Sequence, residues 1–294
     1  MSQATVLNLA LPKGRMQQGV IDLLAGAGID VSLPSRGYRP EISVPWLACK
    51  VLKPQAIVEM LDAGRRDVGF AGADWVSELG ANVVEVLDTH LDVVRLVVAA
   101  PRDLVRHGNE ISLPRRPLLV ASEYQRLTAR WIQTRGCDDR LVRSYGATEV
   151  LPPDDADVVI DVTATGSTLQ ANGLDIVETL MTSSTRLYAS HQAMDDPARR
   201  VHVETLALLL GSVLNARQRV MVELNVSAEN LQAVAAALPC MREPTVSRLL
   251  GPKGESGFAV KAAVRRDSLP QLIPLLKARG GSDLVISPIS QVVL

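Results

Sequence analysis

The sequence predicts an α/β protein with two lobes, followed by a C-terminal β-α-β-β-α-β domain. Short β-branched runs alternate with helical patterns over the first hundred residues, which is typical of an α/β sheet. The proline-containing stretch 109–117 then crosses into a second α/β run, which returns to the first near residue 185. The last 76 residues follow the order of the split ferredoxin-like motif.

In the first lobe, apolar β-branched runs predict strands, and apolar residues at helical spacing predict helices. The expected strands are 5–11, 67–71, 83–87 and 93–99, and the expected helices are 16–27 and 55–64. Two strand ends lead into loops that carry charge, residues 13–15 and residues 72–74.

In the second lobe, the same criteria predict strands at 117–121, 157–161 and 185–189 and helices at 124–135 and 195–217. A chain that crosses to a second lobe and returns forms a cleft between the lobes. Small-molecule sites often lie in such clefts.

The C-terminal domain shows the clearest pattern. The expected strands are 219–226, 244–250, 258–264 and 283–289, and the expected helices are 228–238 and 268–281. Ser227 and Asp267 are predicted to cap these helices, and Pro270 falls in a first turn, where proline is tolerated.

The composition excludes several classes of protein. The chain has 294 residues, 47% hydrophobic and 21% charged, which indicates a globular protein of two or three domains. A net charge of -1 and 3% aromatic residues argue against nucleic-acid binding. With no apolar stretch of transmembrane length and no signal-peptide pattern, we expect no membrane association and a cytoplasmic location. Cys49, Cys137 and Cys240 are widely spaced, which favours reduced, buried thiols over disulfides or a zinc site.

The strongest local feature is a carboxylate followed by a hydroxyl-rich turn. Asp161 ends a buried strand, and Thr165-Gly166-Ser167-Thr168 then opens a short helix. Successive backbone N–H groups and three hydroxyls suit a phosphate dianion, and the acid could reach the hydroxyls of an attached ribose. An ordinary strand–turn–helix with Ser and Thr caps has the same pattern, so the pattern alone leaves both interpretations open.

Two more strand ends carry candidate binding residues. Lys13 and Arg15 flank Gly14 in a strand-to-helix loop, where cations suit a pyrophosphate, although solvated loop charges are the commoner case. Gly72 and Asp74 face any cleft between the lobes, and a helix-capping aspartate explains them equally well.

The sequence contains no motif for a familiar nucleophile or metal cage. The four histidines, His90, His107, His191 and His202, lack metal-ligand spacing. GxSxG, HExxH and GxxxxGK[ST] are absent. The predicted chemistry therefore depends on positioning and electrostatics.

Several stretches spread along the chain occur in the order found in one known family. They are LALPKGR (9–15), DVGFAGAD (67–74), LVVAAP (96–101), the block 149–169, ANGL (171–174), STRLY (184–188) and the domain 219–294. The most specific element joins Asp161, Thr165-Gly166 and Thr168-Leu169 to Ala171-Asn172-Gly173. Over nearly its full length, the chain resembles the long form of the ATP phosphoribosyltransferase family, which acts first in histidine biosynthesis.

The resemblance implies that N1 of ATP attacks C1 of 5-phosphoribosyl 1-diphosphate (PRPP), with release of pyrophosphate and a requirement for Mg²⁺. Substrate phosphates and water would hold most of the Mg²⁺, without a dedicated protein cage. The implied PRPP site comprises Glu149, Asp161, Ala164, Thr165, Gly166, Ser167 and Thr168. The resemblance implies catalytic roles for Lys13, Arg15 and Asp161. It implies contacts with ATP for Arg36, Lys53, Gly72 and Asp74.

The resemblance also implies a domain division and regulation. Residues 1–98 with 185–217 would form one catalytic domain and 99–184 a second, PRPP-binding one, with a fold like periplasmic binding proteins. Residues 218–294 would be a regulatory domain that binds histidine as a feedback inhibitor. Glu223, Thr245 and Ser287 are the candidate histidine contacts. The family's assembly implies a homo-oligomer, dimer to hexamer.

The chain departs from the family pattern at a few positions. Lys53 and Ala56 stand where Arg-x-x-Asp is usual, and lysine lacks the bidentate geometry of arginine. The interval from Glu149 to Asp161 is one residue shorter than usual, and Asp154 replaces a common glycine.

Two other functions stay open at this point. A two-lobed binding protein would bind an amino acid and not PRPP, but it has no use for an acid beside a phosphate-cradling turn. A different phosphoribosyltransferase would use another base as acceptor, but the ferredoxin-like C-terminal domain argues against it.

Overall fold

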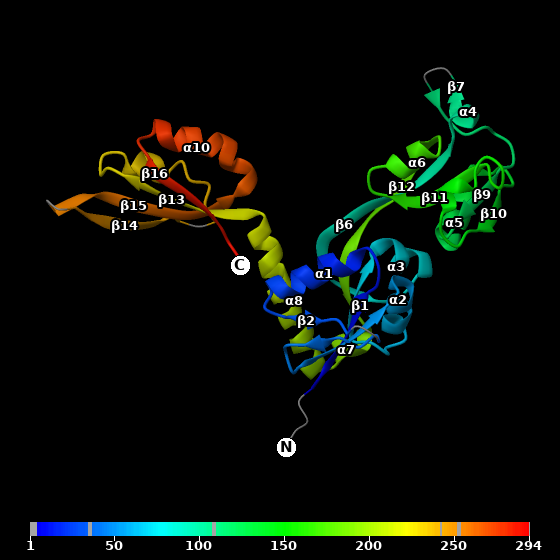
Figure 1. Ribbon diagram of the computed structural model, residues 1–294, viewed down its shortest axis with the longest axis horizontal. Helices are drawn as coiled ribbons and strands as arrows, with labels where there is room; N and C mark the ends of the chain where they lie inside the picture. The colour runs from blue at the N-terminus through cyan, green and yellow to red at the C-terminus, as the bar shows by residue number, and fades with distance from the viewer. Residues whose placement is uncertain (1–4, 35–36, 108–109, 242, 252–253, 294) are drawn as a thin grey trace. The chain divides into compact units, whose positions relative to one another are not determined.

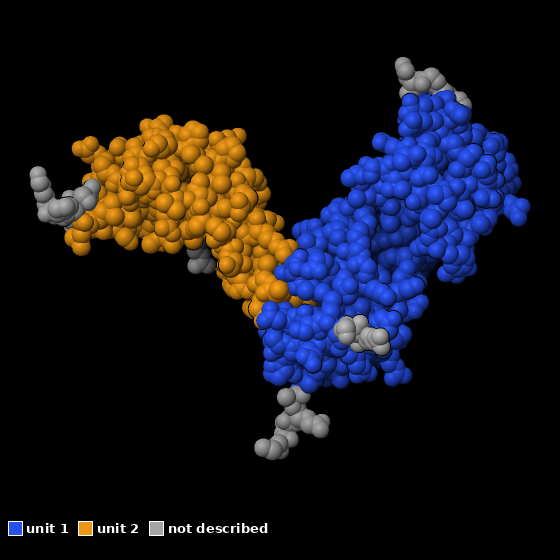
Figure 2. Space-filling model, viewed as in Figure 1, with its two compact units in different colours: residues 1–22, 29–207 blue, residues 23–28, 208–294 orange. Residues whose placement is uncertain are grey.

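The chain divides into two compact units (Figure 2). The computed structural model describes residues 5–34, 37–107, 110–241, 243–251 and 254–293. One unit comprises Met1–Asp22 and Ile29–Ala207, and the other comprises Leu23–Gly28 and Leu208–Leu294.

The first unit is built on one mixed eight-stranded sheet of order β10-β9-β11-β6-β12-β5-β1-β4. Its strands are β1 (Leu7–Pro12), β4 (Leu47–Leu52), β5 (Val68–Gly72), β6 (Val84–Pro101), β9 (Leu119–Ser122), β10 (Arg140–Arg143), β11 (Val158–Thr163) and β12 (Leu174–Ala189). β6 and β12 are long antiparallel neighbours in the middle of the sheet, and both extend from one lobe to the other (Figure 1). They therefore connect a lobe around β1, β4 and β5 to a lobe around β9, β10 and β11.

Apolar sequence explains the central strands. Every residue of β5 is buried, and β1 is buried except at Asn8, as expected of strands covered on both faces. The helices that begin in this unit are α1 (Met16–Gly26), α2 (Pro54–Asp62), α3 (Ala73–Leu79), α4 (Arg102–Val105), α5 (Gln125–Arg135), α6 (Ser167–Ala171), α7 (His191–Asp195), α8 (Pro197–Arg217) and the 3-10 turn η1 (Thr148–Val150). The last residues of α1 and of α8 belong to the second unit. Two-stranded ribbons pair β2 (Val31–Ser32) with β3 (Glu41–Ile42) and β7 (Arg106–His107) with β8 (Glu110–Ile111).

Two buried carboxylates of α3 connect the lobes. The Asp74 carboxylate accepts hydrogen bonds from the Ser183 and Tyr124 hydroxyls, each at 2.6 Å. The Glu78 carboxylate accepts from the backbone N–H groups of Arg126 (2.8 Å) and Leu127 (3.0 Å). Because the first N–H groups of a helix lack intrahelical partners, Glu78 caps α5 from across the cleft.

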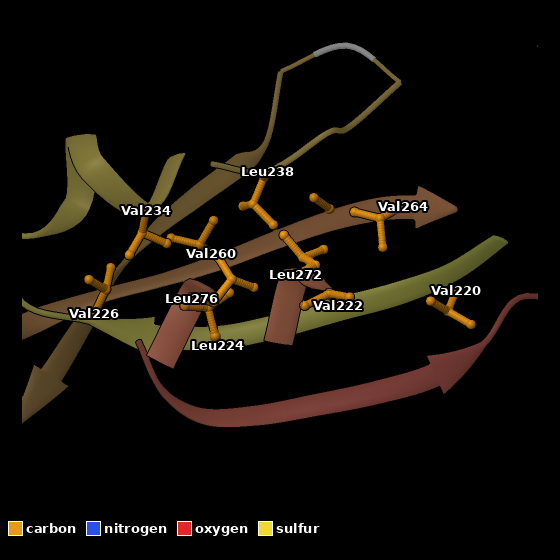
Figure 3. Close-up of a cluster of buried hydrophobic side chains, with 11 residues drawn as sticks. Val220, Val222, Leu224, Val226, Val234, Leu238, Val260, Val264, Leu272 and Leu276 are labelled. Carbon is orange, nitrogen blue, oxygen red and sulfur yellow. The ribbon is translucent and has the colours of Figure 1, made fainter. Parts of the chain in front are cut away.

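The second unit contains a ferredoxin-like sheet of order β14-β15-β13-β16, which confirms the predicted β-α-β-β-α-β arrangement. Its elements are β13 (Arg219–Val226), α9 (Leu231–Ala235), β14 (Thr245–Gly251), β15 (Gly254–Arg265), the 3-10 turn η2 (Arg266–Ser268), α10 (Leu269–Ala278) and β16 (Ser282–Pro288). Alternate residues of β13 and β15 pack against the helices, with Val222, Leu224 and Leu276 at the centre (Figure 3). The opposite face of the sheet carries the intervening side chains.

Some predicted elements are wrong in extent. The segments 83–87 and 93–99 form one strand, β6, because pairing with β12 continues through the polar residues between them. Left-handed backbone at His90 (φ 54°) and Asp92 (φ 49°) accommodates this irregular stretch. The strand predicted at 185–189 is only the end of β12, and residues 73–74 begin helix α3 instead of continuing a loop.

Helix α8 confirms the helix predicted over 195–217, with its start at Pro197, where Asp196 caps it by accepting from Ala198 N–H at 2.9 Å. The short helix α7, which ends at Asp195, was not predicted. Two helices of the second unit differ from the prediction. The segment 228–238 is helical only over α9, and Ser227 makes no side-chain cap there. Asp267 does not cap α10, because its carboxylate pairs with Arg265 at 2.6 Å. Pro270 lies in the first turn as predicted.

Cys49, Cys137 and Cys240 form no disulfide among the described residues. Cys49 is buried, which raises its pKa to about 12, whereas Cys137 and Cys240 are only half-buried, contrary to the expectation. Within the described ranges, no helix is long and apolar enough to cross a membrane.

Candidate active site

The hydroxyl-rich turn lies at the carboxyl end of β11, where it can meet a ligand. Gly166 adopts a left-handed conformation (φ 84°) and its N–H donates to Thr163 Oγ1 at 2.9 Å. This positive φ, which favours glycine, turns the chain directly into α6. Thr165, Ser167 and Thr168 are exposed, and the Thr165 hydroxyl donates to Ser167 Oγ at 3.0 Å.

These residues line a pocket of about 270 Å³, called here the cradle pocket. It is lined by Arg15, Glu149, Asp161, Val162, Thr163, Ala164, Thr165, Ser167, Thr168 and Leu169. Every residue predicted for PRPP binding except Gly166, which forms the turn itself, therefore lines one cavity. Its open edge, exposed hydroxyls and nearby cation suit a phosphate group.

A second pocket, of about 310 Å³, shares Arg15, Asp161 and Val162 with the cradle pocket and is called the central pocket. Lys13, Gly72 and Asp74 also line it. The Gly14 turn (φ 90°) places Lys13 and Arg15 at the start of α1, with both side chains exposed. The structure thus brings both predicted cations and Asp161 together.

Asp161 is held in an environment that disfavours its charge. Burial raises the pKa of its carboxyl to about 6, and the neighbouring charges of Glu123 and Glu149 add to the rise. The backbone N–H of Val162, which donates to the carboxylate at 2.6 Å, opposes it. Any positive charge that develops beside this carboxyl group therefore stabilises its ionised form.

Asp74 lines the central pocket, but its carboxylate already accepts hydrogen bonds from the Tyr124 and Ser183 hydroxyls. These bonds give Asp74 a structural role in joining the lobes besides any role in the pocket. Lys53 does not line the central pocket. It lies in an adjoining outer pocket of about 430 Å³, which shares Gln55, Trp75 and Glu123 with the central pocket. Arg36 lies outside the described residues.

The sequence interpretation missed several lining residues of the central pocket: Met16, Pro54, Gln55, Trp75, Asp92, Val94, Glu123, Tyr124, Val162, Ser183, Ser184 and Thr185. Most come from β6, β12 and the loop before α5, which carry no local motif. Asp92 stands out because its unusual backbone conformation is secured by the Thr185 hydroxyl, which donates to its carboxylate at 3.0 Å.

In the second unit, the candidate histidine contacts lie on the sheet face opposite the helices. Lys261 pairs in register with both Glu223 and Thr245, and its ammonium lies 2.7 Å from the Glu223 carboxylate. Thr245 and Lys261 line a pocket of about 600 Å³, whereas Glu223 and Ser287 do not. Ser287 pairs with Met221, which also lines this pocket.

A carboxylate, a hydroxyl-rich turn and two cations line connected pockets, an arrangement that suits an enzyme acting on a phosphorylated small molecule. The family model described as HisG: ATP phosphoribosyltransferase matches residues 53–211, and that described as HisG, C-terminal domain, matches residues 216–291. The chain belongs to the ATP phosphoribosyltransferase family, which comprises pentosyltransferases of histidine biosynthesis.

Similar proteins span nearly the same length. An ATP phosphoribosyltransferase of Pelotomaculum thermopropionicum is 34% identical over 293 residues, covering 98% of this chain and 99% of that protein. One of Chlorobium phaeovibrioides is 36% identical over 285 residues, covering 95% of each. A solved ATP phosphoribosyl transferase (HisG:HisZ) complex from Thermotoga maritima contains a chain with TM-score 0.62 and 24% identity. That match covers 71% of this chain and 99% of the solved chain, and it supports the fold.

Proposed function

We propose that this chain transfers the 5-phosphoribosyl group of PRPP to N1 of ATP and releases pyrophosphate. The observation that carries the proposal is the shared wall of the cradle and central pockets, where Asp161 and Arg15 lie beside the hydroxyl-rich turn. The backbone and hydroxyls of 165–168 hold the 5-phosphate, and Glu149 helps to orient the same substrate.

The residues then act on a transition state that resembles an oxocarbenium ion. As the C1–O bond to pyrophosphate breaks, positive charge develops on the ribose, and the Asp161 carboxylate stabilises it while holding the ribose hydroxyls. Lys13 and Arg15 hold the leaving pyrophosphate, whose negative charge grows in the same step. No enzyme nucleophile is needed.

A phosphoribosyltransferase family generally depends on a metal ion, and we infer that the ion here is Mg²⁺. Within the described residues, no group of three or more His, Cys, Asp or Glu side chains is arranged to hold a metal ion. The donor chemistry nevertheless fits, because Asp161 and Glu149 both line the cradle pocket and supply hard oxygen ligands close enough for their charges to interact. One or two of them would hold Mg²⁺ together with pyrophosphate oxygens. The ion would neutralise charge on the leaving group.

Replacing Thr168 by valine tests the cradle. The variant keeps the shape of the side chain but removes one donor to the 5-phosphate, so we expect KM for PRPP to rise about tenfold, with a small change in KM for ATP. Thr179→Val, an exposed position on β12 outside the pockets, is the matched control. An unchanged KM for PRPP in the Thr168 variant would show that this hydroxyl does not bind the 5-phosphate.

We further propose that histidine inhibits the enzyme by binding to the second unit. The pocket beside Thr245 and Lys261 is large enough for an amino acid, and Glu223 offers a carboxylate to an α-amino group next to it. Like Glu223, Ser287 does not line the pocket, and it is included because it pairs with Met221, which does. Calorimetry of L-histidine with the full chain and with its Thr245→Val variant tests the assignment. Unchanged affinity in the variant would place the amino acid elsewhere.

We also propose that the chain forms a homo-oligomer, dimer to hexamer, as family membership implies. A cytoplasmic location follows from the proposed substrates, since phosphorylated nucleotides and sugars are made and retained inside cells. We propose no nucleic-acid or membrane partner, consistent with the net charge of -1.

A further inference from the structure

Two of the five carboxylates around the cradle and central pockets have no partner in the part of the chain that the structure describes. Asp74, Asp92 and Asp161 each accept at least one hydrogen bond. Glu123 and Glu149 are half-buried, and no hydrogen bond or ion pair to either is found among the described residues. Because desolvating an unpaired carboxylate is costly, such a group is suited to a ligand that brings its own donor.

The two unpaired carboxylates face different spaces. Glu149 lines only the cradle pocket, on the side proposed to hold the phosphoribosyl group. Glu123 lines the central and outer pockets but not the cradle pocket. Glu123 therefore belongs to the space left for the acceptor nucleotide.

The acceptor space also has an aromatic wall. Trp75 lines the same two pockets as Glu123, and its ring stacks on Tyr124 with centroids 4.7 Å apart. A half-buried indole beside an unpaired carboxylate suits a flat heterocycle that carries an amino group. Glu123 is also near enough to Asp161 for their charges to interact, so a base held by Glu123 lies next to the ribose that Asp161 is proposed to hold.

The acceptor chemistry calls for negative charge at this position. When the N1 lone pair forms the new N1–C1 bond, the C1–O bond breaks and its electron pair leaves with pyrophosphate. The adenine ring gains one positive charge, which is shared between N1 and the adjacent exocyclic nitrogen at C6. Later loss of one proton from that nitrogen to water restores a neutral ring.

We propose that Glu123 is a further catalytic residue, which accepts a hydrogen bond from the exocyclic amine of ATP and stabilises the positive charge that the ring gains in the transition state. This inference rests on the proposed function and adds a residue that selects a 6-aminopurine. Its contribution grows as the charge develops, so it acts on kcat more than on KM for ATP.

The test compares Glu123→Gln with the wild-type chain on two acceptors, ATP and purine riboside triphosphate, which keeps N1 but lacks the amine. With ATP, we expect kcat of the variant to fall about tenfold or more. With the analogue, the variant and wild type should differ by less than about twofold. Glu110→Gln, an exposed residue on β8 that lines none of the cradle, central and outer pockets, is the matched control and should retain activity.

Other outcomes would overturn the inference. An equal loss on both nucleotides, or a loss reversed by raising Mg²⁺, would mean that Glu123 serves PRPP, pyrophosphate or the metal ion. An unchanged kcat with ATP would show that Glu123 takes no part in the reaction. If the analogue gives no measurable turnover, Glu123→Asp decides, because a retained charge should recover part of the lost kcat. Absence of product from ATP in the wild type would instead refute the proposed function.

Discussion

Asp161→Asn is expected to lower kcat by about 100- to 1,000-fold, with KM values changing much less. The substitution keeps the size of the side chain and removes the negative charge placed beside the ribose. Because the charge matters most when the oxocarbenium-like state forms, the loss falls on the chemical step. Steady-state kinetics with ATP and PRPP measure it. A loss confined to KM for PRPP would reduce Asp161 to a binding residue.

The same carboxyl sets an expected pH dependence. Its folded-state pKa of about 6 lies above the ordinary value of 3.8, so the ionised, active form is lost as pH falls through about 6. Burying this charge also costs stability at pH values above that range, where the folded chain holds it ionised. We therefore expect Asp161→Asn to remove the acid limb near pH 6 and to raise the melting temperature at pH 7.5. A lower melting temperature would contradict the burial argument.

Leu276→Ala is expected to lower the free energy of unfolding of the second unit by about 2–5 kcal/mol. Leu276 is fully buried between α10 and the sheet, in contact with the cluster that includes Val222 and Leu224 (Figure 3). Removing most of its side chain leaves a cavity that the paired strands cannot easily fill. Denaturant titration of the full chain measures the effect on the transition of this unit.

The activity of Leu276→Ala gives a second readout. If histidine acts through the second unit, the variant should lose histidine inhibition at temperatures where basal product formation persists. Leu275→Ala is the matched control, since that side chain is 39% exposed on the same helix. Histidine inhibition that survives loss of the unit's folded structure would contradict the regulatory proposal.

Local patterns predicted the parts of the fold that depend on neighbouring residues. The apolar runs of β1, β5 and β11 were recognisable because these strands are buried on both faces. β6 was predicted as two strands because its polar middle resembles a turn, and only its non-local pairing with β12 keeps it extended. The segment 228–238 differs in the opposite direction. Its residues favour a helix throughout, but only Leu231–Ala235 is helical in the folded chain.

The residues of the candidate site also differ in whether the sequence could predict them. The cradle is contiguous, so Asp161 and residues 165–168 could be found from sequence spacing. The acceptor side is assembled from distant segments: Ser183 meets Asp74 across 109 residues, and Glu123 precedes an ordinary helix. A single acid in a loop carries no sequence signal, and its lack of a partner becomes visible only in the folded chain.

The most direct test of the account is an absorbance assay for phosphoribosyl-ATP with the full chain, ATP, PRPP, Mg²⁺ and pyrophosphatase. The account predicts product that requires both substrates, falls to a trace in Asp161→Asn, and decreases when histidine is added. Product that does not form with ATP, although the folded chain binds PRPP in calorimetry, would contradict the assigned acceptor. Absence of both product and PRPP binding would contradict the site itself.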